Sequence, residues 1–272
     1  MDSKNEYIFT RDFLDNTRIN MMHHIWTKIF GYNIHPKISS EAANLRVADV
    51  GTGTGIWLFD VQDKLKKARL DGFDVSFNTA PLRETLPPNI SFRHWDVKGD
   101  VPEDLVGAYD IINVRFFSYV LLDDDVLGVV AKLFRLLKPG GYLQWGEPDM
   151  ETMRLDKTKP ENKTENLVEL LQLFTVQDDR LKPTWVRHLS EIFSKAGFVD
   201  IEQDTKDAPP HLAFMFHEAG LMIHDLFARK TKNEHMAREL GRLLPVAVEE
   251  NKHGVYGTAL RVTVIGRKPR ER

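Results

Sequence analysis

The middle of the chain alternates short apolar runs with amphipathic ones, the pattern of strands separated by helices. Apolar runs of strand length cover residues 45–50, 68–75, 90–95, 109–114 and 142–146. Helical spacing follows the first run, from Ile56 to about Leu65, and precedes the last run, over Val126–Leu137. Strands that alternate with helices indicate right-handed crossovers and a parallel sheet covered on both faces.

The last part of the chain has a different pattern. Residues 197–205 and 258–266 are both strand-like, and Leu260, Val262 and Val264 alternate along the second of them. A long helical stretch lies between these two segments. The sequence therefore predicts two strands that are separated by helix near the C-terminus.

Two stripes of apolar residues at helical spacing, over residues 14–29 and 212–227, stand outside this pattern. Either stripe can pack in the core or form a lid over the carboxyl edge of the sheet, and the sequence leaves both interpretations open. Arg18 lies near the centre of the first stripe. A guanidinium among apolar side chains needs an anion or a carbonyl as its partner.

The composition is that of an ordinary globular protein, with 42% hydrophobic and 28% charged residues. The 37 Lys and Arg residues against 40 Asp and Glu give a formal net charge of −3, which argues against nucleic acid as a partner. No apolar run is long enough to span a membrane and no apolar signal core opens the chain, so we expect a cytoplasmic protein without a membrane partner. The absence of cysteine excludes disulfides, thiolate nucleophiles and Cys-ligated zinc.

The segment DVGTGTG, residues 49–55, lies where the first strand turns into the first helix of the core. Glycines at such a turn allow positive φ and let a ligand approach the backbone. Ile56 stands where a G-x-G-x-x-G fingerprint would need its third glycine, and the chain has no G-x-x-x-x-G-K-[ST] phosphate loop. Asp49 at the start of the loop suits a ligand with a positive end better than one with a phosphate.

Two further carboxylates follow the next strands. Asp74 ends the second strand, about 20 residues after the loop, where a carboxylate can bind both hydroxyls of a ribose. Asp96 follows the third strand and can accept a hydrogen bond from an adenine amino group, with Trp95 or Val97 against the ring. Each Asp alone is explained by turn capping. Three Asp residues at successive strand ends, in step with the glycine loop, indicate a binding site.

These residues resemble those of the class I S-adenosylmethionine-dependent methyltransferases. The resemblance rests on DVGTGTG (49–55), GFDVS (72–76), HWDV (94–97), YDIINVR (109–115) and LKPGGYL (137–143). It implies a Rossmann-like α/β fold, with a seven-stranded sheet in the order 3-2-1-4-5-7-6 and an antiparallel last strand. We therefore expect one methyltransferase domain with an N-terminal helical lid (1–43), a cofactor-binding core (44–150), and substrate-side helices with a terminal β-hairpin (151–272).

The N-terminal segments LDNTRINMMHHIW (14–26) and GYNIHP (31–36) narrow the resemblance. They are similar to those of fungal natural-product methyltransferases, a group that includes O-methyltransferases of indole-alkaloid pathways and related regulators of secondary metabolism. In such enzymes the N-terminal helix closes over the cofactor, which makes Arg18 a candidate for binding the cofactor's carboxylate. An ion pair between Arg18 and a core Asp is the alternative.

The resemblance implies S-adenosyl-L-methionine as the cofactor. Loop glycines would cradle its methionine part, Asp74 would bind the ribose, Asp96 with Val97 would bind the adenine, and Arg115 would line the site beside the substrate. The expected cofactor-binding residues are Arg18, Asp49, Gly51, Thr52, Gly53, Gly55, Asp74, Val75, Asp96, Val97 and Arg115.

A sulfonium methyl group is already activated, so catalysis requires alignment, exclusion of water and at most one base. His24 is the first candidate for that base, and His23 lies on the opposite flank of the same helical stripe. His211, His217 and His224 belong to the later helical stretch, and the last two fall on its polar side. A lone histidine is more often structural, and this alternative stays open for each of them.

Glu147 follows the fifth strand, and we expect it to contact the substrate at the carboxyl edge of the sheet. The run Asp123–Asp125 resembles a metal cluster, but its position before a helix favours N-capping, so no metal is expected. Residues 113–117, NVRFF, lack the N-P-P-Y or D-P-P-Y signature of many enzymes that methylate DNA bases. A small-molecule substrate is therefore expected.

The main hypothesis is O-methylation of a fungal metabolite by a monomer or homodimer. N- or S-methylation is the alternative within the same class. A second class is a relative that binds S-adenosylmethionine without transferring its methyl group, either a pericyclase or a regulator.

Overall fold

A computed structural model describes residues 7–42 and 44–270 of the chain. Residues 1–6, 43 and 271–272, which belong to the predicted lid and C-terminal segments, lie outside the described residues. The strands are β1 (Arg46–Val50), β2 (Arg69–Asp74), β3 (Ile90–His94), β4 (Tyr109–Arg115), β5 (Leu137–Lys157), β6 (Val199–Lys206) and β7 (Val255–Arg267). The helices are α1 (Phe13–Phe30), α2 (Ile56–Lys64), α3 (Val126–Leu136), α4 (Glu165–Thr175), α5 (Leu189–Lys195), α6 (Pro210–Lys230) and α7 (Glu234–Lys252).

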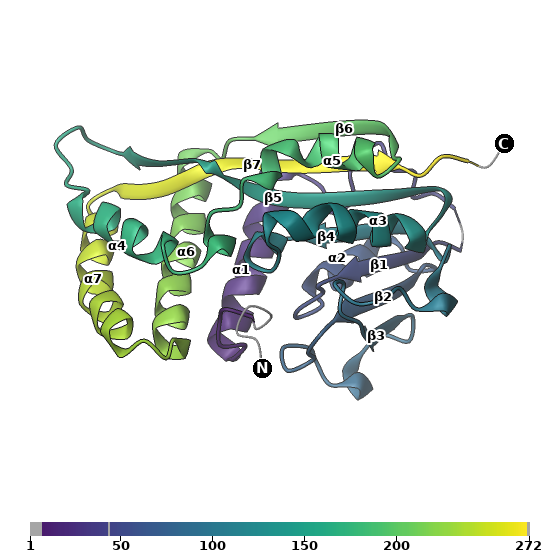
Figure 1. The fold of residues 1–272 in the computed structure, drawn as a ribbon, viewed down its shortest axis with the longest axis horizontal. Helices are drawn as coiled ribbons and strands as arrows, with labels where there is room; N and C mark the ends of the chain where they lie inside the picture. The colour runs from purple at the N-terminus through teal and green to yellow at the C-terminus, as the bar shows by residue number, and fades with distance from the viewer. Residues whose placement is uncertain (1–6, 43, 271–272) are drawn as a thin grey trace.

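The seven strands form one sheet in the order β3-β2-β1-β4-β5-β7-β6 (Figure 1). β1 to β5 pair in parallel, whereas β7 is antiparallel to both of its neighbours, β5 and β6. The predicted Rossmann-like α/β fold and its strand order are therefore confirmed. The last two strands pair as predicted, but α6 and α7 are inserted between them in the chain.

The central strands are buried on both faces, which explains why they read as continuous apolar runs. Val47 of β1 and Ile111 of β4 pack with α2 on one face. Their neighbours Ala48 and Ile112 belong to the core cluster with α3 and α5. Because successive side chains of a strand point to opposite faces, one sheet supports two apolar cores.

α1 begins and ends at residues with clear local roles. The Asp12 side chain accepts hydrogen bonds from the backbone N–H groups of Leu14 and Asp15, which caps the first turn. Gly31 ends the helix with a φ of +82°, the left-handed conformation that glycine adopts without strain. The first apolar stripe is thus one helix, which lies between the core of the sheet and α6 (Figure 1).

β5 is much longer than the strand predicted over residues 142–146. It continues past the sheet edge, where Arg154 to Lys157 pair with the residues from Thr258 back to Val255 of β7. This two-stranded ribbon leads to α4, α6 and α7 at the opposite end of the molecule from β3 (Figure 1). The extension was missed because its backbone partners come from β7, about a hundred residues later in the chain. Among the described helices, none has the length and apolar character needed to cross a membrane.

Candidate functional site

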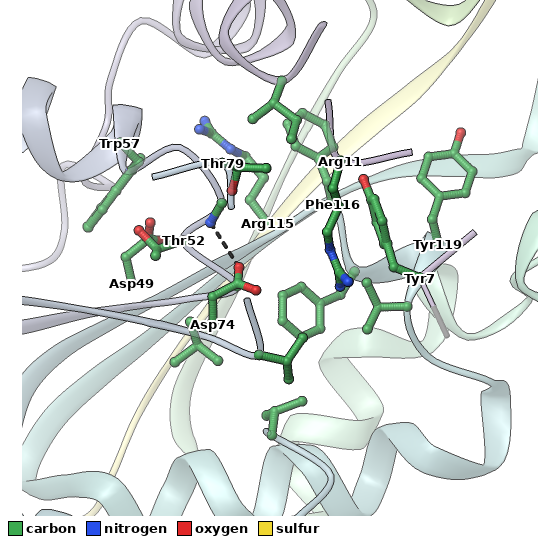
Figure 2. Close-up of a pocket in the computed structure, with 18 of the residues that line it drawn as sticks. Tyr7, Arg11, Asp49, Thr52, Trp57, Asp74, Thr79, Arg115, Phe116 and Tyr119 are labelled. Carbon is green, nitrogen blue, oxygen red and sulfur yellow. Dashed lines mark hydrogen bonds between the residues drawn. The ribbon is translucent and has the colours of Figure 1, made fainter. Parts of the chain in front are cut away.

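A cavity of about 370 Å³ opens at the edge of the sheet where β1, β2 and β4 end. Its walls are the glycine loop after β1, the residues that follow β2, β3 and β4, and α1 with the segment before it. Figure 2 shows the carboxylates of Asp49 and Asp74 on one side, with Tyr7, Arg11 and Tyr119 on the other. All the predicted cofactor-binding residues except Gly55 line this cavity.

The glycine loop uses its three glycines in different ways. Gly51, Gly53 and Gly55 have φ values of +71°, +55° and +80°, which L side chains rarely adopt. A Cβ on Gly51 would overlap the ring of Phe117, whereas a Cβ on Gly53 would meet no neighbour closer than 3.9 Å. Gly55 is the N-cap residue directly before α2, and a Cβ on it would lie 2.6 Å from the ring of Phe92. Gly53 therefore leaves open space for a ligand, and Gly55 serves the turn.

A row of polar side chains crosses the three central strands and ends at Asp49. Asn113 Nδ2 donates to Asp49 Oδ1 at 2.8 Å, and Gln144 Nε2 donates to Asn113 Oδ1 at 2.9 Å. The strand register places these residues opposite one another. The same Gln144 binds the loop after α1, because it donates to the carbonyl of Asn33 and accepts from the N–H of His35. The Asp49 carboxylate is thereby held in one orientation.

Burial determines the charge state of Asp49. Desolvation raises the pKa of this carboxyl to about 6, although the hydrogen bond from Asn113 acts in the opposite direction. A positively charged group in the cavity would favour the ionised carboxylate. The position therefore suits a cationic ligand, as the sequence predicted.

Asp74 connects the end of β2 to the glycine loop. Its Oδ2 accepts from the Gly53 N–H at 3.0 Å, the bond drawn in Figure 2, and its Oδ1 accepts from the Ser76 N–H at 3.1 Å. Burial raises the pKa of Asp74. Since each carboxylate oxygen has two lone pairs, Asp74 can accept further hydrogen bonds from hydroxyl groups.

The residues after β3 form the outer part of the cavity. Asp96 is exposed and accepts from the Lys98 N–H at 2.9 Å, while Trp95 and Val97 are each 6% exposed. All four line the cavity. A carboxylate beside two apolar side chains is suited to a flat heterocycle that carries an amino group.

Arg18 has its partner within α1. Its Nη2 and Nε donate to Asp15 Oδ1 at 2.7 and 3.0 Å, and it also contacts the Tyr7 hydroxyl and the Met22 sulfur. The sequence left open an ion pair with a core Asp, and the structure has that ion pair. Both residues line the cavity. Asp15 Oδ2 is buried and has no hydrogen-bond partner among the described residues, so it can accept from a ligand.

His23, not His24, faces the cavity. His23 Nε2 lies 2.8 Å from Asp60 Oδ2, and its Nδ1 contacts the Arg115 guanidinium. Because an arginine can only donate, His23 Nδ1 is the acceptor and its Nε2–H donates to Asp60. Burial, with the Arg115 charge beside it, lowers the pKa of His23 to about 4. His23 is therefore neutral at pH 7 and both of its nitrogens are engaged.

The prediction of His24 as the residue at the site is corrected. One position further along α1 rotates a side chain by about 100°, and His24 is exposed and lines no part of the cavity.

Arg115 lines the cavity and, within the described chain, forms no ion pair with a carboxylate. Burial lowers the pKa of Arg115 to about 10, so the guanidinium stays charged at neutral pH.

Glu147 is also corrected, because it lies behind the cavity wall. Its Oε1 accepts from Trp145 Nε1 at 2.8 Å and from the Phe117 N–H, and its Oε2 accepts from the Ser118 N–H at 3.2 Å. The side chain is fully buried and does not line the cavity. Burial raises the pKa of Glu147 to about 7. It holds the turn after β4 and does not reach the place where we expected it to contact a substrate.

The run Asp123–Asp125 forms a short 3-10 turn that leads into α3. Asp125 accepts from the Leu122 N–H at 3.2 Å and pairs with Lys98 at 2.9 Å. Asp125 stands at the N-cap position of α3 but makes no side-chain capping hydrogen bond to that helix, so only the predicted position of the run before the helix is confirmed.

Sequence reasoning missed several cavity residues, namely Tyr7, Arg11, Asp15, Asn113, Tyr119 and Arg180. Asn113 had a signal, because it is a polar residue in an otherwise apolar strand, opposite Asp49 in the parallel register. Tyr7 and Arg180 had none, since they come from segments far from the glycine loop in sequence.

Comparisons with known proteins agree with this geometry. Residues 47–141 match the family model of a methyltransferase domain. The methyltransferase grgD of a Penicillium species is 32% identical over 146 residues, 51% of this chain and 50% of the relative. The N-methyltransferase gliN of Aspergillus fumigatus is 28% identical over 159 residues, 58% of this chain and 56% of the relative. The chain thus spans about half the length of these curated relatives.

A third relative covers more of the chain. The secondary metabolism regulator LAE1 of Cochliobolus heterostrophus is 27% identical over 215 residues, 75% of this chain and 66% of the relative. Among solved structures, the phosphoethanolamine N-methyltransferase 2 of Haemonchus contortus in complex with S-adenosylhomocysteine is similar with a TM-score of 0.51. That likeness has 17% identity and covers 96% of this chain and 60% of the other, so it shows the fold alone.

Residues 47–141 thus match a methyltransferase domain, and the sheet has the strand order that the resemblance to class I methyltransferases implied.

Proposed function

We propose that this chain is an S-adenosylmethionine-dependent methyltransferase that methylates a small molecule of fungal secondary metabolism. One observation carries the proposal. The Asp74 carboxylate is bonded to the Gly53 N–H at the edge of the sheet, in a cavity that has the buried Asp49 at its inner end. A ribose, a cationic amine and an adenine can then bind to Asp74, Asp49 and Asp96 in turn.

The cavity fits the two charged ends of the cofactor's methionine part. The ammonium group would find carboxylate oxygens at Asp49 and at Asp15, whose buried Oδ2 has no partner in the described chain. The carboxylate would bind Arg115, a buried guanidinium that contacts the neutral His23 and the ring of Phe116 and that, within the described residues, forms no ion pair with a carboxylate. Arg18 is the second candidate for this carboxylate, although it already pairs with Asp15.

The cofactor, when bound, would supply a methyl group on a sulfonium. The acceptor's lone pair would form the new bond to this methyl carbon, and sulfur would keep the electron pair of the S–C bond that breaks. The chain's own residues bind, orient and exclude water. α1 covers the glycine loop through a hydrogen bond of 2.6 Å between Thr54 Oγ1 and Asn20 Oδ1. Phe116 and Tyr119 form part of the wall after β4. This arrangement supports alignment and desolvation of the reacting atoms.

Oxygen is the acceptor atom that we propose first, as expected from the N-terminal segments. Nitrogen is supported by the name of the relative gliN, an N-methyltransferase. Carbon-13 NMR of the methylated product distinguishes the two, because O-methyl and N-methyl carbons resonate at different shifts. We further propose a single methyltransferase domain that acts in the cytoplasm, as a monomer or homodimer, without a nucleic-acid or membrane partner.

A regulator that binds the cofactor but methylates no small molecule is the second candidate, since the relative LAE1 is a regulator of secondary metabolism. Mass spectrometry of a fungal extract incubated with protein and cofactor separates the two. A metabolite that gains one methyl group together with formation of S-adenosylhomocysteine supports the enzyme. An unchanged extract with no S-adenosylhomocysteine supports the regulator.

The cofactor site is tested with Asp74→Ala, which removes the acceptor for the ribose hydroxyls. We expect the affinity for S-adenosylhomocysteine, measured by calorimetry, to fall by about 1–3 kcal/mol. Asp63→Ala, an exposed position on α2 outside the cavity, is the matched control and should bind normally. Unchanged binding by a folded Asp74→Ala variant would overturn the assignment. Stabilisation by NAD or ATP but not by S-adenosylhomocysteine would overturn the proposed function itself.

A further inference from the structure

A second cavity, of about 90 Å³, lies between α4, α6 and the far part of the β5–β7 ribbon. It shares Met22 and Tyr119 with the first cavity, so the two spaces are neighbours. Its walls are mostly apolar, with Leu170 and Phe174 from α4 and Leu221 from α6. Such a lining is typical of sites for small organic molecules.

Unpartnered polar atoms gather in this cavity. His217 Nε2, His224 Nε2, Thr258 Oγ1 and Arg261 Nε are buried and have no hydrogen-bond partner among the described residues. All four residues line the cavity, and none is more than 6% exposed. A buried polar atom without a partner costs about 1–3 kcal/mol, so such groups are rare unless a ligand or water binds them.

Arg261 is the most demanding of these groups. It lies on β7, is 1% exposed, and donates from Nη1 to the carbonyl of Ala259 at 2.8 Å. Its guanidinium stacks on the ring of Phe216 at 4.3 Å. No ion pair joins it to a carboxylate within residues 7–42 and 44–270. Burial lowers the pKa of Arg261 to about 10, so the buried charge persists at neutral pH and calls for an anionic or carbonyl oxygen.

His224 contributes an acceptor. Its Nδ1 lies 3.2 Å from the carbonyl oxygen of Gly220, so the ring hydrogen is on Nδ1 and Nε2 carries a lone pair. Burial lowers the pKa of His224 to about 4, which keeps the ring neutral. Gly257 makes room for Met153 and His217, because a Cβ there would lie 2.6 Å from Met153 Cε and 3.2 Å from His217 Nδ1. The cavity thus combines one cationic side chain with a neutral imidazole nitrogen that can accept a hydrogen bond from a ligand.

We propose that the second cavity binds the methyl acceptor, an apolar molecule whose anionic or carbonyl oxygen contacts the Arg261 guanidinium and whose hydroxyl or N–H contacts His224 Nε2. This proposal rests on the proposed function. Because Met22 and Tyr119 belong to both cavities, an acceptor held here lies beside the cofactor. Carboxylic acids, enols and phenols next to a carbonyl share this chemistry.

The test uses benzoate, benzamide and benzylamine, three probes with one ring and a negative, neutral or positive group. Each is titrated into the full chain saturated with S-adenosylhomocysteine, which keeps the probes out of the first cavity, and binding is followed by ligand-observed NMR. We expect benzoate to bind about tenfold or more tightly than benzylamine, with benzamide between them. Arg261→Met should remove this preference, and Arg261→Lys should keep most of it.

A second variant tests the location without touching the charge. Gly220 of α6 lines the cavity, and a Cβ there would meet nothing within 4 Å, so Gly220→Leu should fill the space and weaken all three probes about tenfold or more. Gly241→Leu is the matched control, because Gly241 of α7 is also helical and open but lies outside the cavity. It should leave probe binding unchanged.

Three results would overturn the proposal: no binding of any probe at millimolar concentration, a preference for benzoate that survives Arg261→Met, or probe binding that Gly220→Leu leaves intact. If Arg261→Met does not fold, as judged by thermal unfolding, the Gly220→Leu comparison decides. Calorimetry with S-adenosylhomocysteine is performed first. A protein that binds it but not the probes fails only this inference, whereas one that does not bind it fails the proposed function.

Discussion

The two cavities share a wall but differ in how their polar side chains are satisfied. Around the glycine loop, Asp49, Asn113 and Gln144 bind one another in a row, and Asp74 binds the loop backbone. Among the described residues, the first cavity keeps two buried polar atoms without a partner, Asp15 Oδ2 and Thr52 Oγ1, whereas the second keeps four, on His217, His224, Thr258 and Arg261. The first set is held rigid before any ligand arrives, as an invariant cofactor requires. The second set leaves hydrogen bonds for a ligand to complete, as a specific acceptor requires.

The largest effect on stability is expected when the Arg18–Asp15 ion pair at the first cavity is broken. Arg18→Met leaves the fully buried Asp15 without its cation and should lower the free energy of unfolding by about 3–5 kcal/mol, measured by urea denaturation. The double variant Asp15→Leu/Arg18→Met removes both charges and should recover most of the loss. A loss below about 1 kcal/mol in the single variant would show that this buried ion pair contributes little to stability.

The same double variant separates the two roles of Arg18. If the Arg18–Asp15 pair binds the methionine part of the cofactor, through Arg18 to its carboxylate or Asp15 to its ammonium group, the double variant should bind S-adenosylhomocysteine more weakly although its stability is restored. Normal binding would assign the carboxylate to Arg115 and leave Arg18 a structural role.

The next effect comes from the glycine loop. Gly51→Ala places a side chain at φ +71° and against the ring of Phe117, and it should lower the free energy of unfolding by about 2–4 kcal/mol. Gly107→Ala is the control, because Gly107 has φ +64° but nothing within 4 Å of a Cβ, so only the backbone term of about 1 kcal/mol should remain. Equal losses of unfolding free energy for Gly51→Ala and Gly107→Ala would mean that the Phe117 ring moves aside without measurable cost.

The smallest effect is expected in the second region, as a dependence on pH. Burial lowers the pKa of His217 from 6.5 to about 4. Between pH 6.5 and 4, His217 therefore takes up a proton in the unfolded chain but not in the native chain. The stability contributed by the neutral His217 is present above pH 6.5 and lost as the pH falls towards 4. His217→Gln should reduce this acid-induced loss by about 1–3 kcal/mol.

Urea denaturation at pH 7, 6, 5 and 4 measures the difference. His211→Gln, an exposed position on the same helix, is the control and should keep the wild-type profile. A wild-type profile in His217→Gln would contradict burial of that imidazole.

The carboxyl groups of Asp49 and Glu147 titrate in the opposite sense, because burial raises their pKa values to about 6 and 7. Their contribution to stability falls as the pH rises through these values.

Much of the first region could be predicted from the sequence. Glycines, apolar strands and a carboxylate at each of three strand ends are local features, and parallel strands bring their carboxyl ends to one edge. The sheet order and the position of the glycine loop are confirmed, and residues 47–141 match a methyltransferase domain. The roles of the individual cofactor-binding residues stay predictions, although the structure places all of them except Gly55 at one cavity.

The errors concern directions of side chains. His24 and His23 are adjacent in sequence, but only His23 faces the cavity. Glu147 stands at the predicted edge of the sheet, but the alternation of side chains along β5 turns it to the same face as Trp145, beneath the turn after β4. A shift of one residue along a helix or a strand turns the side chain to another face, and this decides whether it lines the cavity or packs behind it.

The sequence by itself determined the alternation of strands and helices and the shape of the loop at the sheet edge, because these follow from hydrophobic period and backbone freedom within short segments. The strand order was implied by the resemblance to the class I methyltransferases. Only the tertiary structure decided which polar groups are paired and which are left for a ligand. In the sequence Arg261 is one charged residue in an apolar strand, and its place in a cavity whose walls carry no carboxylate depends on how α4, α6 and the β5–β7 ribbon pack together. Burial and hydrogen-bond partners depend on contacts between segments far apart in the chain.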